Sequence, residues 1–207
     1  MKPETSQMVS NALNNLEAGL ASALTYTATK AYIAGDLFAQ KNIGVKLGFD
    51  LVKRAADDYA NEYKRLLVEQ GGGYVVENGN LIFKPWFQEA NQKAREEVAD
   101  MINTGIREGK SIDDIKKPLR KYFRQRKRHA EMVARTETAK IQDIANTRRL
   151  EEQGVDKVQW ITAEDERVRD SHAERHMQIF GIRDAPSLGE PNCRCVKVAV
   201  VDNNNDE

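Results

Sequence analysis

Both cysteines and two of the three histidines of this 207-residue chain lie in one short stretch, between Trp160 and Cys195. His172 and His176 are four residues apart, so on a helix they would share a face and could chelate one ion. Cys193 and Cys195 are two residues apart, so on a strand both would point to the same side. Two imidazoles and two thiols suit tetrahedral zinc. The stretch therefore predicts a structural zinc site that joins a short helix to the last strand.

Three other interpretations of these residues remain open. The histidines can be partly exposed hydrogen-bonding residues, with the cysteines as small buried apolar groups. One of the two pairs can bind a metal together with Asp165 or Asp170. A third interpretation makes Cys193 a nucleophile that a neighbouring histidine activates. The segment H-A-E-R-H differs from the H-E-x-x-H motif of zinc hydrolases, because Glu174 would lie on the opposite helical face from the histidines, so an architectural site is favoured over an enzyme.

Composition places the chain among soluble, surface-rich proteins with one domain, or one domain and a helical extension. It is 40% hydrophobic and 31% charged, with a formal net charge of zero, so any attraction to nucleic acid must be local. Cysteines separated by one residue rarely bond to each other, which indicates free thiols or metal ligands in a reducing compartment. The sequence has neither a secretory leader pattern nor a long apolar run, so we expect a protein made in the cytoplasm that does not span a membrane.

Hydrophobic periodicity predicts an α+β protein that is mostly helical, with an extended amino-terminal helical region and a compact carboxyl-terminal α/β domain with a small sheet. Gly35-Asp36 is expected to break the first helix, and Asn78-Gly79 is the turn signal of a β-hairpin. The expected helices cover residues 7–34, 45–69, 86–108, 112–123 and 129–153, with a short one at 172–177. The expected strands are the hairpin at 74–84 and the segments 155–161, 179–182 and 193–201.

Residues 116–128 carry the one strong local charge. Eight of these thirteen positions are basic and none is acidic, and the segment is expected to run from a short helix into a loop. One interpretation is a solvated face. The other is a contact surface for the DNA backbone or for an acidic protein partner. The basic residues are Lys116, Lys117, Arg120, Lys121, Arg124, Arg126, Lys127 and Arg128.

Several pieces of the sequence, taken in order, resemble the phage Mu protein F-like minor head proteins, also called the phage head morphogenesis family. The pieces are E-G-K-S-I-D-D-I-K-K-P-L-R, A-R-T-E-T-A, R-L-E-E-Q-G, a tryptophan strand followed by D-E-R-V-R-D-S-H-A-E-R-H, and P-N-C-R-C. The resemblance covers roughly residues 90–200. The family often has a glycine directly after the second histidine, where this chain has Met177.

The resemblance implies a virion protein present in few copies, associated with the portal vertex and with head assembly, DNA packaging or DNA ejection. The implied partners are the portal protein or the major capsid protein, and genomic DNA, without a membrane. The implied division has a helical region at 1–85, the family domain at 86–201 and a disordered tail at 202–207. The alternatives are a metal-dependent hydrolase or nuclease delivered with the genome, and a DNA-binding adaptor. The family's characteristic residues fall on Arg135, Thr136, Glu137, Asn146, Trp160, Asp165, Arg167, His172, His176, Cys193, Arg194 and Cys195. We expect Arg135 and Glu137 to bond to the turn at 165–169.

Overall fold

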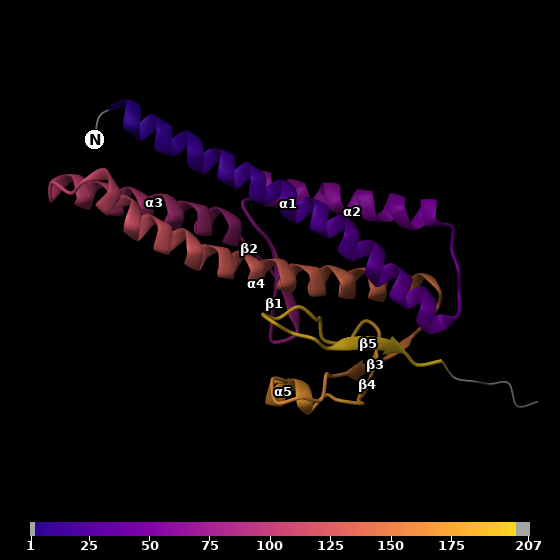
Figure 1. Ribbon diagram of the computed structural model, residues 1–207. Helices are drawn as coiled ribbons and strands as arrows, with labels where there is room; N and C mark the ends of the chain where they lie inside the picture. The colour runs from indigo at the N-terminus through magenta and orange to yellow at the C-terminus, as the bar shows by residue number, and fades with distance from the viewer. Residues whose placement is uncertain (1–2, 202–207) are drawn as a thin grey trace, which may run out of the picture.

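The computed structural model describes residues 3–201, and the chain is an α+β protein, as predicted. Four long helices form an elongated layer, and a small sheet packs under one half of it (Figure 1). The helices are α1 (Pro3–Ile43), α2 (Phe49–Glu69), α3 (Trp86–Arg107), α4 (Ile112–Glu152) and the short α5 (Asp170–Ala173). The strands are β1 (Gly73–Glu77), β2 (Asn80–Lys84), β3 (Lys157–Ile161), β4 (Ile179–Gly181) and β5 (Val196–Ala199). The predicted tail at 202–207 lies outside the described residues.

Helices α1 and α4 pack along each other and carry the main core. This core joins small residues of α1, such as Ala28, to Ile141 of α4 and to Tyr63 of α2. The expected break at Gly35 is wrong, since α1 continues to Ile43. A Cβ atom at Gly35 would lie 2.2 Å from the Gln142 carbonyl oxygen of α4, so this glycine permits close approach of the two helices. Because the core draws on both sides of position 85, the helical region and the family domain share it.

Helix α4 is one continuous helix of 41 residues, where the sequence predicted two helices and an intervening loop. Ser111 caps its start, because its side chain accepts a hydrogen bond from the Asp114 amide. Pro118 lies inside the helix without ending it. The segment 116–128 stays helical because lysine and arginine are good helix formers and α3 packs beside it.

The hairpin predicted at 74–84 is present, and the other three strands form a small sheet. Strands β1 and β2 pair antiparallel around Asn78 and Gly79, which both have positive φ, as a type I′ turn requires. The second sheet has the strand order β4-β3-β5 and is antiparallel throughout. The last strand begins at Val196, so the prediction of a strand from Cys193 is wrong by three residues.

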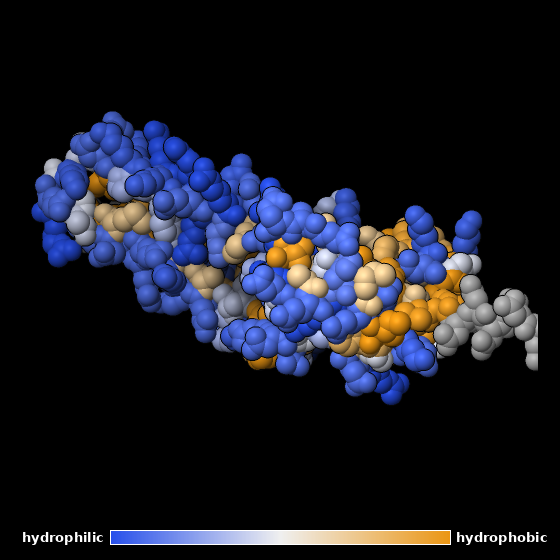
Figure 2. Space-filling view, turned by 90° about the horizontal axis from the view of Figure 1, so that it is seen from below, coloured by the Kyte–Doolittle hydropathy of each residue, from blue (hydrophilic) through white to orange (hydrophobic). Residues whose placement is uncertain are grey.

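The two faces of the three-stranded sheet differ in their exposure to solvent. Val158 and Trp160 of β3 are buried on the inner face. The opposite face leaves Ile179 54% and Val196 38% exposed. Seen from below, hydrophobic surface gathers toward the end of the molecule where the sheet lies, while the other end is mostly hydrophilic (Figure 2). Within residues 3–201, no helix is long and apolar enough to cross a bilayer.

Candidate functional site

A row of buried polar residues on α4 organises the carboxyl-terminal half of the protein. Its members recur at every third position, which keeps them on neighbouring faces of the helix over about three turns. All of them are at most 9% exposed. The row consists of Glu137, Lys140, Asp143, Asn146 and Arg149.

The two ends of the row bind the amino-terminal elements. The Tyr63 hydroxyl of α2 donates a hydrogen bond of 2.7 Å to Glu137, which also pairs with Lys140 at 2.7 Å. Lys140 donates in turn to the backbone carbonyl of β1 at Tyr74. At the other end, Arg149 pairs with Asp36 of α1 at 2.8 Å. These contacts satisfy charges that would be costly to bury alone.

The centre of the row binds β5 and the loop before it. Asp143 pairs with the buried Lys197 ammonium at 3.0 Å and accepts the Leu188 amide at 2.9 Å. Burial raises the pKa of Asp143, and the charge of Lys197 opposes that shift. The Asn146 side chain donates to the Lys197 carbonyl oxygen at 3.0 Å. Asn146, a residue that the family resemblance singled out, therefore fixes the backbone of β5 against α4.

Below this row lies a cluster of one imidazole and two thiols. His172 Nδ1 is 3.7 Å from the Cys193 sulfur and 3.4 Å from the Cys195 sulfur. All three side chains are buried, and their ligand atoms lie within 4.8 Å of one another. The Trp160 ring meets the imidazole edge-on, with ring centres 5.5 Å apart. The cysteines belong to the loop before β5, yet this loop still directs both sulfurs at His172.

The two thiols are electrostatically coupled. A hydrogen bond from the Cys195 thiol lowers the pKa of Cys193 to about 6. The pKa of Cys195 is raised, because its proton is shared with the Cys193 sulfur and because the group is buried. One thiolate therefore forms easily in this cluster, while the other sulfur holds its proton.

His176 does not join this cluster, so the structure brings together three of the four residues predicted as metal ligands. Helix α5 ends at Ala173, so the two histidines do not lie on one helical face. The Thr162 amide donates to His176 Nδ1 at 3.2 Å, and His176 Nε2 lies 2.6 Å from the Glu164 carboxylate. Both ring nitrogens are thus engaged, and His176 holds the turn between β3 and α5 in place.

The turn at 165–169 is held by an ion pair from the C-R-C segment. Arg194 binds both oxygens of Asp165, at 2.6 and 2.5 Å, and lowers the pKa of Asp165 to about 2. The expected bonds from Arg135 and Glu137 to this turn are wrong. Glu137 bonds to Tyr63 and Lys140 instead, and Arg135 is exposed and makes no bond to the turn among residues 3–201. Arg167 is exposed and contributes its backbone amide to Asp165.

The basic segment 116–128 is now placed on the amino-terminal half of α4, away from the sheet (Figure 1). At 100° per residue, five of its cations fall within about 120° of the helix circumference. They are exposed and form no ion pair with any residue in the described range 3–201: Arg120, Lys121, Arg124, Lys127 and Arg128. Lys116 and Lys117 pair with Asp113 and Asp114 one turn earlier. We call the five free cations the basic face.

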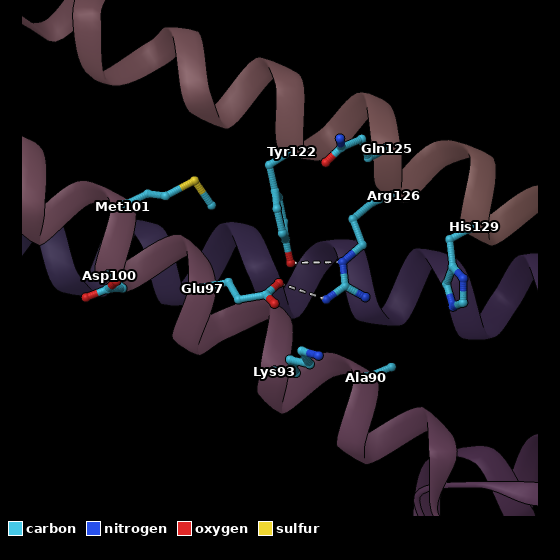
Figure 3. Close-up of a pocket in the computed structure, with 9 residues that line it drawn as sticks. All are labelled: Ala90, Lys93, Glu97, Asp100, Met101, Tyr122, Gln125, Arg126 and His129. Atoms are coloured by element: carbon cyan, nitrogen blue, oxygen red, sulfur yellow. Dashed lines mark hydrogen bonds and ion pairs between the residues drawn. The ribbon is translucent and has the colours of Figure 1, made fainter.

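Arg126 points away from the basic face, into a groove of about 700 Å³ between α3 and α4 (Figure 3). It donates to the Tyr122 hydroxyl at 2.9 Å and pairs with Glu97 of α3 at 3.2 Å. The hydrogen bond from Tyr122 is the main reason that the pKa of Glu97 is lowered. This network fastens α3 to α4 and removes Arg126 from the set of cations available to a partner.

Sequence reasoning missed four residues that build this region. Lys140, Asp143 and Lys197 were not singled out in the sequence, and Glu190 falls in the segment expected to be a loop. The repeat of polar residues at every third position of α4 is a signal that would have found the first two. Lys197 lies in an apolar strand, V-K-V-A-V-V, where a lone charge indicates a buried partner.

Comparisons with known proteins find one family and two relatives that match part of the chain. Residues 96–198 match the family described as "Phage Mu protein F like protein". An uncharacterized protein of Haemophilus influenzae is 32% identical over 114 residues, which is 53% of this chain and 26% of that protein. An uncharacterized protein of Methanocaldococcus jannaschii is 34% identical over 111 residues, 52% of this chain and 18% of that protein. The chain thus spans about a quarter or less of the length of each of these two relatives. No solved structure matches it.

Proposed function

Residues 96–198 belong to the phage Mu protein F-like family, and from this premise we propose that the chain is a minor head protein of a tailed phage or related virus. The family is one of structural head proteins. The proposed place is the portal vertex or the head interior, and the proposed role is in head assembly, DNA packaging or DNA ejection. The partners would be the portal protein or the major capsid protein, together with the genome.

The proposal is supported most directly by the different surroundings of the two halves of α4. The carboxyl-terminal half of this helix is fixed to α1, α2, β1 and β5 through the buried polar row. Its amino-terminal half presents the basic face to solvent. One rigid helix therefore connects an anchored unit to a surface that matches a polyanion. The exposed apolar face of the sheet supports a protein partner for the anchored end, since such surfaces are typical of interaction sites.

The basic face fits the phosphate backbone of DNA better than it fits a specific base sequence. Its five cations are spread over residues 120–128, about 12 Å of helix at 1.5 Å per residue. Side chains of this kind neutralise phosphates and release counterions, and they carry no base-reading pattern. We therefore propose contact with the genome backbone as the role of this face.

Quantitative mass spectrometry of heads purified from the virus that encodes this chain tests the assignment. The expected result is a peptide set for this protein at a low, fixed ratio to the major capsid protein. The chain should remain with the heads after high-salt washing. Absence from purified heads would refute the assignment, whereas chelator-sensitive DNA cleavage by the purified protein would favour the alternative of a metal-dependent hydrolase.

Salt-dependent binding to a random-sequence DNA duplex tests the basic face. We expect affinity to fall steeply with salt, and the double variant Arg124→Gln/Arg128→Gln to reduce the log–log slope by about 2. Arg126→Gln is the matched control, because it removes an equal charge per residue from the face that binds α3. Equal loss of affinity per charge in the variant and the control would contradict a role for the basic face.

A further inference from the structure

The spacing within the cluster of His172, Cys193 and Cys195 matches the edges of a metal tetrahedron. With zinc–sulfur bonds of about 2.3 Å and a zinc–nitrogen bond of about 2.05 Å, a tetrahedral angle places sulfur and nitrogen about 3.6 Å apart. The observed separations from His172 Nδ1 are 3.4 and 3.7 Å. We propose that these three side chains bind one zinc ion, with His172 as a ligand through Nδ1 and with His176 outside the site.

Glu190 supplies the orienting contact that such a histidine needs. Its carboxylate lies 3.4 Å from His172 Nε2, on the side of the ring away from the sulfurs. A carboxylate at that position favours the proton on Nε2 and leaves the lone pair of Nδ1 directed at the two sulfurs. Metal-bound histidines commonly donate their second nitrogen to a carboxylate in this way. Glu190 is therefore a positioning residue, and its side chain is only 20% exposed.

The two thiols are placed to bind the same ion, because their sulfurs and His172 Nδ1 all lie within 4.8 Å of one another. When zinc binds, any proton still held by either thiol leaves to solvent, and each sulfur forms one zinc–sulfur bond. Because the thiols are buried, the thiolates gain charge compensation from the ion that solvent does not provide.

The fourth coordination position of the proposed zinc ion has room for a water molecule. A cavity of about 10 Å³ adjoins the cluster and is lined by Arg167, Val168, Asn192 and the three ligands, among others. This volume accommodates about one water and excludes an organic substrate. Three protein ligands and a water are a set that catalytic zinc sites also use. Because the cavity here has no room for a substrate, the ion would act by joining α5 to the loop before β5 around Trp160.

Metal analysis of the purified full-length chain tests this proposal, independently of any role in a virion. We expect one equivalent of zinc per chain. Replacement by Co²⁺ should give intense visible bands of tetrahedral cobalt and a sulfur-to-cobalt charge-transfer band whose strength corresponds to two thiolates. A chain without zinc whose cobalt complex lacks these bands would overturn the proposal, and this readout needs no variant.

Four variants then assign the ligands. Cys193→Ser and Cys195→Ser should each lose the ion, and Glu190→Gln should bind zinc about 10- to 100-fold more weakly. His176→Gln should keep one equivalent and an unchanged cobalt spectrum. If His176→Gln loses the ion as fully as Cys193→Ser, or if both serine variants bind as the unaltered chain does, the three-ligand site is wrong.

Discussion

Met177 adopts a backbone conformation that suits glycine better than methionine. Its φ is 64°, in the left-handed region, where a side chain costs roughly 1–2 kcal/mol. The resemblance implies a glycine directly after the second histidine in many members of the family, and a glycine would fit this conformation. The strain persists because the Met177 amide donates to the Trp160 carbonyl oxygen at 2.8 Å and leads the chain into β4.

Substitution of Met177 by glycine should therefore stabilise the protein. Relief of the strain should exceed the entropy that glycine gains in the unfolded chain, with a net rise of about 1 kcal/mol in the free energy of unfolding. Chemical denaturation measures the difference. The control is Glu174→Gly, at a residue in right-handed helical conformation with φ −58°, where glycine should destabilise by roughly 0.5–1 kcal/mol. A loss of stability in both variants would contradict the account of the turn.

The ion pair of Asp165 with Arg194 should give a defined pH dependence. The folded pKa of Asp165 is about 2, below the value of about 3.9 for an unfolded aspartate. A lowered pKa means that the contribution of Asp165 to stability is present above pH 4 and is lost as the pH falls from about 4 to about 2. The difference in melting temperature between the protein and Asp165→Asn should shrink across that interval. A difference that stays constant down to pH 2 would show that Arg194 does not hold the carboxylate.

At the scale of elements, the contact between α1 and α4 depends on Gly35. A Cβ atom there would lie 2.2 Å from the Gln142 oxygen and 2.8 Å from its Cα, both of which are backbone atoms. Gly35→Ala should therefore force the helices apart and lower the free energy of unfolding by about 1–3 kcal/mol. Gly19→Ala in the same helix is the control, because its new Cβ meets nothing within 4 Å and alanine should add up to about 1 kcal/mol. Changes of the same sign in both variants would contradict the close approach.

The sequence predicted elements well where the signal is local. The hairpin followed from Asn78-Gly79, and the helix expected from residue 112 begins there, capped by Ser111. The break at Gly35 was wrong because a glycine that weakens an isolated helix can be kept for packing against another helix. The loop predicted in 116–128 was wrong because α3 packs on this segment, through contacts such as Arg126 with Glu97, and the charge pattern does not indicate that packing.

The same limit applies to the candidate site. The sequence placed His172, Cys193 and Cys195 together, although the strand assumed for the cysteines was wrong. It could not separate His176 from them, because an interval of four residues only implies a common face if the helix continues. The partners of Glu137 and Lys140 lie on α2 and β1, more than sixty residues earlier, and spacing along α4 cannot identify such distant contacts.

At the scale of the whole molecule, α4 connects a half that is anchored in the fold to a half that we propose contacts DNA. The buried polar row fixes one half of the helix to α1, α2, the hairpin and β5. The other half carries the basic face on an arm built with α3 (Figure 1). Because the helix is continuous, the position of the anchored half determines where the basic face can lie in a particle.

A cryo-electron microscopy reconstruction of the portal vertex, computed without imposed capsid symmetry on heads of the virus that encodes this chain, tests this account most directly. The account predicts two parallel helices, α1 and α4, each about 60 Å long, with the sheet end against a head protein and residues 120–128 toward packaged DNA. Density for these helices with the basic face turned away from the genome would contradict the role of α4. Portal-vertex density into which the fold does not fit, in heads shown to contain the chain, would contradict the proposed location.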